Sequence, residues 1–281
     1  MVKLTLNTLV LLGLICTITG KEVPIEPQIV NGESVGAAGV DSNGNEIIKN
    51  TGEFPYIVSL DEKGFHVCAG VIIGEDMVLT ADHCVHGVDP NILQVRAGTL
   101  SIYKGVEKTE QVLNVERVTS HPYFRASDNL NDVAILWLKG KFRFNQYVNK
   151  VKMSTLTGAD YVGQKLTVMG WGSDKKYSRT VTLKKATLTV LDLTECRKIL
   201  HQWSVPDTMI CVFDPEHVQT TCSGDSGGPI VHHNPDNVNE DVFIGIKSGG
   251  FCDPNWPTLY ADVGQLQGWV LKEVDRKMRG C

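Results

Sequence analysis

The chain has 281 residues, 42% of them hydrophobic and 21% charged, a composition typical of a folded protein that excludes a disordered chain. The formal net charge is −5, which argues against a protein that binds nucleic acid through a basic surface. Glycine is abundant, with 27 residues, and short runs of Val, Ile and Thr between the glycines favour β-structure.

Residues 1–20 are predicted to be a secretory signal peptide. Lys3 supplies the positive start, and the apolar core at 9–16 is shorter than the roughly 20 residues of a transmembrane helix. A membrane anchor is the alternative, and it is disfavoured because no later segment resembles a span. We therefore expect a secreted, extracellular protein in an environment where disulfides persist, with no membrane partner. Cys16 leaves with the signal peptide, so an odd number of the eight cysteines remains.

A polar loop at 34–53 contains one candidate cation site. Asp41, Asn43 and Asn45 alternate as at the start of an EF-hand loop. The sixth and twelfth positions, however, are Glu46 and Gly52, where that loop needs a glycine and a bidentate glutamate. A plain Asn-Gly turn is the better interpretation, and we predict no metal and no cofactor.

Strand-like segments recur along the chain between turn residues, as in an all-β barrel or sandwich. They lie at 54–60, 71–73, 77–80, 132–138, 165–169, 186–190 and 242–246. The polar, basic stretch at 139–151 is a candidate crossing between two halves. A helix is predicted at about 264–279, because Leu266, Trp269, Val270 and Val274 share one face.

The most specific chemical signal is the octapeptide at 222–229, Cys-Ser-Gly-Asp-Ser-Gly-Gly-Pro. Its central Ser226 lies among glycines, where backbone amides can approach a reacting carbonyl, so the segment can supply a nucleophile and an oxyanion hole. A serine hydroxyl needs an adjacent base to remove its proton. The candidate base is His83, in Leu-Thr-Ala-Asp-His-Cys at 79–84, and the candidate orienting carboxylate is Asp132, at the mouth of an apolar strand.

These three motifs, in the order His, Asp, Ser, resemble those of the chymotrypsin-like serine proteases over residues 29–281. The resemblance implies two six-stranded antiparallel β-barrels packed face to face, at about 29–148 and 149–263, followed by the C-terminal helix. It implies a serine endopeptidase in which His83 takes the proton of Ser226 and Asp132 orients the imidazole. The N–H groups of Gly224 and Ser226 would bind the oxyanion.

The resemblance also implies a zymogen. Residues 21–28 would be a propeptide, and cleavage after Gln28 would free the ammonium of Ile29 to pair with Asp225. Because the family usually has Arg or Lys where this chain has Gln28, a trypsin-like activator is not expected and the activating protease is unknown. An ordinary first strand is the alternative interpretation of residues 29–30.

Three disulfides follow from the same resemblance, each expected to contribute roughly 2–4 kcal/mol to stability. They are Cys68–Cys84, Cys196–Cys211 and Cys222–Cys252. Cys281 is left over, and it is either free or a link to another chain of an otherwise monomeric protein.

The specificity pocket implied by the family has Thr220 at its base, six residues before the nucleophile. No carboxylate stands there to pair with Arg or Lys, so trypsin-like cleavage is disfavoured. Ser248, Gly250 and Thr258 would form the walls, with Gly250 leaving the entrance open and Thr258 narrowing the interior. We expect medium or small apolar side chains before the scissile bond rather than large aromatic ones.

The expected partners are protein or peptide substrates, the activating protease and protein inhibitors. Three other functions are alternatives. A proteolytically silent binding homologue is suggested by Gln28 and by Asp82, which stands before His83 where most members have alanine. A toxin or allergen-like role is open. A lipase-type hydrolase fits worse, since Gly-x-Ser-x-Gly lacks its α/β surroundings here.

Overall fold

The computed structural model describes residues 33–34, 39–40, 46–47, 51–173 and 181–280. The predicted signal peptide, the propeptide with Gln28, the new N-terminus Ile29, residues 41–45 of the candidate cation loop, and Cys281 lie outside the described residues. Among the described helices, none is long and apolar enough to cross a membrane.

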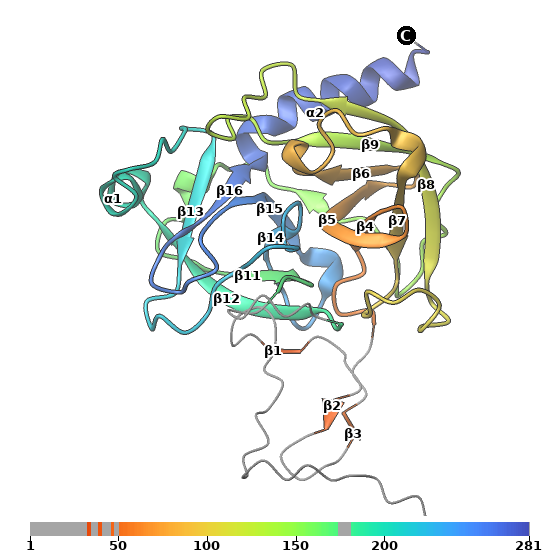
Figure 1. The fold of residues 1–281 in the computed structure, drawn as a ribbon, viewed down its shortest axis with the longest axis horizontal. Coiled ribbons are helices and arrows are strands. Elements are labelled where there is room, and N and C mark those ends of the chain that lie inside the picture. Colours follow the sequence, from red (N-terminus) through yellow and green to blue (C-terminus); the bar gives the residue numbers. More distant parts are fainter. Residues whose placement is uncertain (1–32, 35–38, 41–45, 48–50, 174–180, 281) are drawn as a thin grey trace, which may run out of the picture.

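The first half of the chain forms a closed antiparallel barrel of six strands in the order β4-β5-β6-β9-β8-β7 (Figure 1). These are β4 (Ile57–Glu62), β5 (Phe65–Gly74), β6 (Met77–Thr80), β7 (Leu93–Ala97), β8 (Gln111–Ser120) and β9 (Ala134–Lys139). Branched side chains such as those of Val58, Ile72 and Val95 are fully buried in its interior. Their removal from water is what holds the barrel closed.

The second half forms another barrel, which closes because β12 pairs with both β11 and β13. Its strands are β11 (Lys165–Gly170), β12 (Lys184–Leu191), β13 (Met209–Phe213), β14 (Pro229–His232), β15 (Val242–Gly249) and β16 (Thr258–Asp262). Short strands β1 (Glu33–Ser34) and β10 (Lys152–Met153) add to β12 and β15, and β2 (Gly39–Val40) pairs with β3 (Glu46–Ile47). The predicted two-barrel, all-β fold is confirmed.

Helices are few. The described residues include four 3-10 turns, which are η1 (Asp82–Cys84), η2 (Pro90–Ile92), η3 (Gly158–Tyr161) and η4 (Val238–Glu240), and α1 (Leu193–Ile199) precedes β13. The predicted C-terminal helix is confirmed as α2 (Val263–Met278), with Asp262 capping its first turn. It reaches across to the first barrel, where Lys277 pairs with Asp76 at 2.8 Å and Trp269 packs on His121 (Figure 1).

The barrels are joined covalently and through one shared core. Residues 140–151 lead from β9 to β10, and the amides of Asn149 and Val151 donate to carbonyl oxygens of the first barrel. Tyr56 Oη donates to Asp241 Oδ2 at 2.6 Å across the interface.

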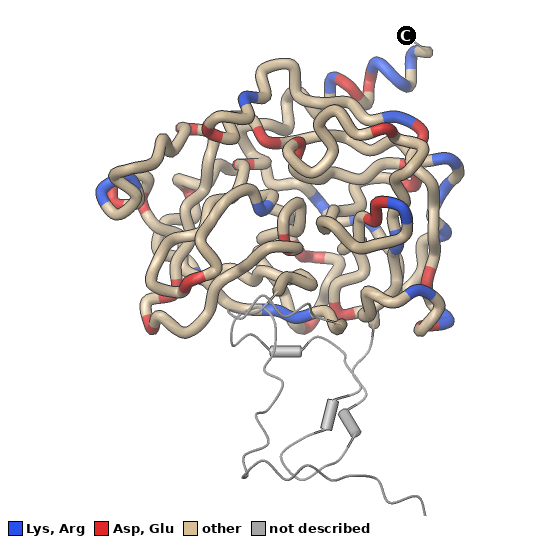
Figure 2. Tube along the Cα trace, in the orientation of Figure 1, with Lys and Arg blue, Asp and Glu red and all other residues tan. Residues whose placement is uncertain are grey.

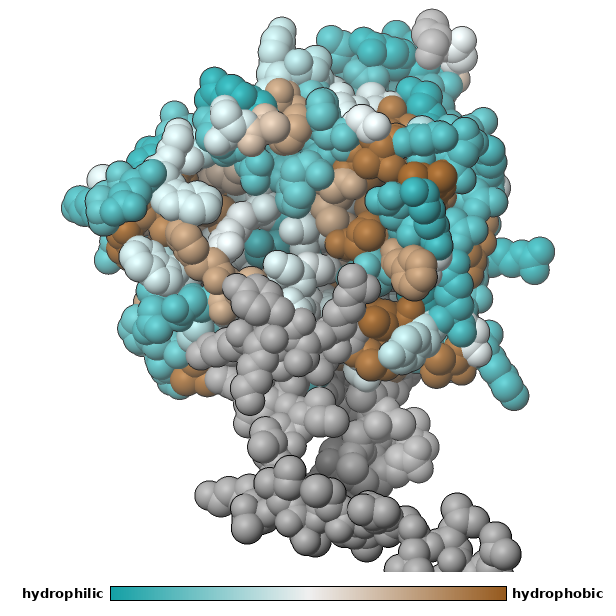
Figure 3. All heavy atoms as spheres, in the orientation of Figure 1, coloured by the Kyte–Doolittle hydropathy of each residue, from teal (hydrophilic) through white to brown (hydrophobic). Residues whose placement is uncertain are grey.

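Charges of both signs are spread over the outside of both barrels (Figure 2), and apolar residues lie exposed between hydrophilic ones on the same face (Figure 3).

Candidate active site

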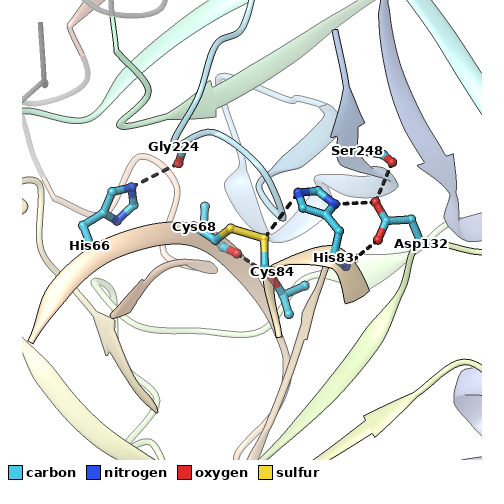
Figure 4. Close-up of a disulfide and its surroundings, with 9 residues drawn as sticks. His66, Cys68, His83, Cys84, Asp132, Gly224 and Ser248 are labelled. Carbon is cyan, nitrogen blue, oxygen red and sulfur yellow. Dashed lines mark hydrogen bonds and ion pairs between the residues drawn. A yellow bond between two sulfur atoms is a disulfide. The ribbon is translucent and has the colours of Figure 1, made fainter. Parts of the chain in front are cut away.

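The pairing of β6 with β9 brings the predicted base and carboxylate together. Thr80 lies opposite Ala134, so η1, just after β6, stands beside Asp132, just before β9. His83 Nδ1 lies 2.7 Å from Asp132 Oδ2, and the backbone N–H of His83 donates to Oδ1 at 2.9 Å (Figure 4). Two bonds to one carboxylate therefore orient both the ring and its main chain.

A third bond to this carboxylate comes from the second barrel. Ser248, on β15, donates its hydroxyl to Asp132 Oδ2 at 2.5 Å, and Asp132 is fully buried (Figure 4). Because an ionised carboxylate only accepts hydrogen bonds, the proton of the imidazole is held on Nδ1 and Nε2 is left able to accept one. Ser248 is predicted as a pocket wall, and its hydroxyl also stabilises the His83–Asp132 pair.

The loop that carries Ser226 folds against the first barrel. Ser226 O accepts a hydrogen bond from the amide of Ala69 at 2.7 Å. Gly227 has φ of +80°, and a Cβ there would lie 2.2 Å from Ala69 O, so a close approach of backbones requires glycine. Ala69 adjoins Cys68, whose disulfide to Cys84 reaches the residue next to the base.

The three predicted disulfides all form. Cys68–Cys84, Cys196–Cys211 and Cys222–Cys252 have sequence separations of 16, 15 and 30 residues. The first one also explains the single group of potential metal ligands among the described residues, Cys68, His83 and Cys84, since sulfurs bonded to each other offer no thiolate to an ion.

The described residues contain no hydrogen bond between Ser226 Oγ, the predicted nucleophile, and His83, the predicted base. His83 Nε2 lies 3.7 Å from Cys84 Sγ (Figure 4). Catalytic hydrogen bonds are often long without substrate, so this geometry is compatible with proton transfer.

The predicted oxyanion donors are the backbone amides of Gly224 and Ser226. Gly224 has φ of +98°, and among the backbone bonds of the described residues neither its amide nor that of Ser226 is a donor. Gly224 O lies 3.0 Å from His66 Nε2, and His66 Nδ1 lies 2.8 Å from Ser59 Oγ (Figure 4). Two amides without a carbonyl partner can converge on a developing negative charge.

Asp225 points away from this loop into the second barrel. Its oxygens accept the amides of Gly172 at 2.7 Å and Cys222 at 2.8 Å, and the residue is 1% exposed. Burial raises the pKa of Asp225 to about 6, against the lowering effect of these amides and of Lys247. The predicted partner, Ile29, lies outside the described residues.

Three predicted pocket residues meet one another. Thr220 Oγ1 lies 3.3 Å from Thr258 Oγ1, and both side chains are buried. Gly250 has φ of +149°, and a Cβ there would lie 3.2 Å from Thr258 Oγ1. Thr220, Gly250 and Thr258 therefore lie together at one end of the second barrel.

Sequence analysis missed one charged residue near this pocket, Lys247. It is 4% exposed on β15, and burial lowers the pKa of its ammonium to about 8, opposed by Asp225 and Asp132. The signal was present, since a lysine directly after the apolar run at 242–246 is unusual for a buried strand.

Asp82, which the sequence singled out, is fully buried and directly precedes His83 of the His83–Asp132 pair. Its Oδ2 lies 2.9 Å from His86 Nδ1, and its Oδ1 has no hydrogen-bond partner among the described residues. Burial raises the pKa of Asp82 and the nearby charge of Asp132 adds to the increase, whereas the side chains of Ser120 and His86 lower it.

Comparisons with known proteins show which family the chain resembles. A family model described as Trypsin matches residues 45–270, a region that contains His83, Asp132 and Ser226. Trypsin-1 of Astacus astacus is 32% identical over 78% of this chain and 94% of that protein. Granzyme H of Homo sapiens is 31% identical over 79% of this chain and 85% of that protein. Trypsin epsilon of Drosophila erecta is 31% identical over 77% and 81% of the two chains.

Proposed function

Because the chain belongs to the trypsin family of serine proteases, we propose that it is a secreted serine endopeptidase with Ser226 as its nucleophile. The observation that carries the proposal is the buried Asp132 carboxylate, which holds the His83 ring at 2.7 Å beside the Ser226 loop. A serine without such a base is a poor nucleophile, and an imidazole without the carboxylate adopts either tautomer.

The reaction uses each of these groups in turn. Nε2 of His83 takes the hydroxyl proton as Ser226 Oγ attacks the peptide carbonyl, and the imidazolium then protonates the leaving amine. The amides of Gly224 and Ser226 bind the oxyanion, and loss of one such donor costs roughly 3–4 kcal/mol of barrier. Water repeats the sequence on the acyl-enzyme and releases the second product as a carboxylic acid.

The enzyme is made as a zymogen in this proposal. Removal of a signal peptide at 1–20 and cleavage after Gln28 free the Ile29 ammonium, which pairs with Asp225 and orders the oxyanion loop. The burial of Asp225 supports this step, because a buried carboxylate gains from a cation, and losing one partner of such a pair costs about 3–5 kcal/mol. The uncut protein is therefore expected to be inactive.

The pocket disfavours basic side chains and takes medium or small apolar ones before the scissile bond. Support comes from the absence of a carboxylate at Thr220 and from the contact of Thr220 with Thr258, which narrows the interior. One methylene changes discrimination by only about 1–3 kcal/mol, so the preference is graded rather than absolute.

A fluorophosphonate probe tests the function on two preparations, one uncut and one that begins at Ile29. We expect labelling of Ser226 in the cut form only, and none in a cut Ser226→Ala variant, which keeps the fold. Peptide mapping of the labelled serine identifies the site. A folded, cut protein that does not label contradicts the proposal and indicates a silent binding homologue.

A further inference from the structure

The side chain of Lys247 begins directly beneath the nucleophile loop. Its backbone N–H donates to Gly228 O at 2.8 Å, and its carbonyl accepts the amide of Gly227 at 2.9 Å. Lys247 also lies opposite Tyr260 in the β15–β16 pair, so the two side chains share one face of the sheet. Two main-chain hydrogen bonds to the residues after Ser226 therefore fix the position of the Lys247 backbone.

The same face carries the lining of the predicted specificity pocket. Thr258 and Tyr260 are two residues apart on β16, so their side chains lie on the same face of the sheet. Thr220 reaches this face through its 3.3 Å contact with Thr258. The Thr221 hydroxyl is buried and has no hydrogen-bond partner among the described residues. Lys247 is thus a cation within a lining rich in hydroxyl groups.

Nothing in the described part of the chain satisfies the Lys247 ammonium directly. It makes neither a hydrogen bond nor an ion pair there, although the residue is only 4% exposed. Asp225 acts on it through space, but the oxygens of Asp225 already accept two backbone amides. A buried cation without a bonded anion is costly, and an incoming carboxylate would relieve that cost.

We propose that Lys247 binds the carboxylate of an aspartate or glutamate placed before the scissile bond, so that the protease accepts acidic residues in its primary pocket. The inference rests on the proposed function. It adds acidic side chains to the apolar ones that the pocket is expected to accept before the scissile bond. Acidic side chains are of small or medium size and suit a pocket narrowed by Thr258. In the cut enzyme the Ile29 ammonium would neutralise Asp225, which leaves the positive charge of Lys247 for the substrate.

Matched peptide substrates isolate this charge. We would measure kcat/KM on two fluorogenic tetrapeptides that differ only in Glu or Gln before the scissile bond, with concentrations set by active-site titration. The cut wild-type enzyme is expected to favour Glu by about tenfold, equivalent to about 1.4 kcal/mol. In Lys247→Met the ratio should fall to about one, whereas Lys247→Arg should retain a preference for Glu.

Lys184→Met is the matched control, since Lys184 is another buried lysine of the second barrel, on β12. Its Glu-to-Gln ratio should equal that of the wild type. A wild-type ratio of about one overturns the inference by itself, even if Lys247→Met fails to fold. An equal loss on both substrates in Lys247→Met overturns it too, because Lys247 would then act only as the counter-charge of Asp225.

The fluorophosphonate probe separates this inference from the proposed function. Labelled enzyme with no preference for Glu contradicts the role of Lys247 alone. Cut protein that does not label contradicts both, since there is then no peptidase for Lys247 to direct.

Discussion

Two buried ionisable residues set this chain apart at the residue scale. Asp82 lies beside the His83–Asp132 pair and Lys247 lies against the loop that carries Ser226, and both are buried with incomplete partners among the described residues. Burial disfavours the charged form of each, which raises the pKa of Asp82 and lowers that of Lys247. Neither residue is explained by packing alone, because an apolar side chain would fill the same space without this cost.

The Asp82 carboxylate has a consequence for stability. Its raised folded-state pKa means that the folded form binds a proton more readily than the unfolded form, so this contribution to stability increases as pH falls. We predict that Asp82→Asn stabilises the protein at pH 7, on the order of 1 kcal/mol. The advantage should shrink as pH falls from 7 toward 4, because the raised pKa makes the folded wild type take up this proton more readily than the unfolded chain does.

Chemical unfolding across this pH range measures the effect, with both proteins in a Ser226→Ala background to prevent self-digestion. Asp89→Asn is the control, since Asp89 is an exposed aspartate that caps a turn at the surface. A stability difference between Asp82→Asn and its parent that does not change with pH contradicts the prediction.

At the scale of elements, the C-terminal helix α2 joins the two barrels through its buried face. Leu266 is 5% exposed and belongs to the shared core, whereas Leu271, on the same helix, is 51% exposed. We predict that Leu266→Ala lowers the free energy of unfolding by about 2–5 kcal/mol, and that Leu271→Ala changes it by less than about 0.5 kcal/mol.

Guanidinium unfolding of both helix variants makes the comparison, and the slope of each transition shows whether the folded state is still compact. The substitution and the helix are the same in the two variants, so helix propensity cancels. Equal losses would mean that propensity, not burial, determines the contribution of α2.

Strand prediction succeeded for several continuous apolar runs, although it missed the one that forms β13 (Met209–Phe213). The segments at 77–80, 165–169 and 242–246 lie within β6, β11 and β15, whose residues are mostly buried. The long strand β8 was missed because most of its side chains are partly or fully exposed. Strand β14 has four residues and begins at a proline, so only its pairing with β11 and β15 makes it a strand.

At the scale of the whole molecule, the two barrels share a single core. Trp137 of the first barrel and Phe243 of the second belong to one buried cluster, and Trp171 Nε1 donates to Leu100 O at 2.8 Å across the interface. We predict that the barrels unfold together, since separating them would expose this cluster and break such bonds.

Tryptophan fluorescence and far-ultraviolet circular dichroism, followed through the same denaturant series in the Ser226→Ala chain with its disulfides intact, test that cooperativity. The two curves should coincide. A first transition that changes fluorescence while leaving most of the circular dichroism unchanged would show that the barrels unfold separately.

The local motifs by themselves determined the reaction class. The octapeptide around Ser226 and the hexapeptide ending at Cys84 are contiguous, so their chemistry and their order can be recognised without a structure. The family resemblance supplied the barrels and the disulfide pairs, which lie too far apart along the chain for local pattern to specify.

Only the tertiary structure decided which distant groups complete the site. Ser248 and Asp132 are 116 residues apart, yet the packing of the barrels makes the serine a donor to the carboxylate. Lys247 directly precedes Ser248. The packing of β15 against β16 and against the loop that carries Ser226 buries the charge of Lys247. A strand pattern tells which residues alternate, but the partner of each side chain depends on which surfaces meet when both barrels close.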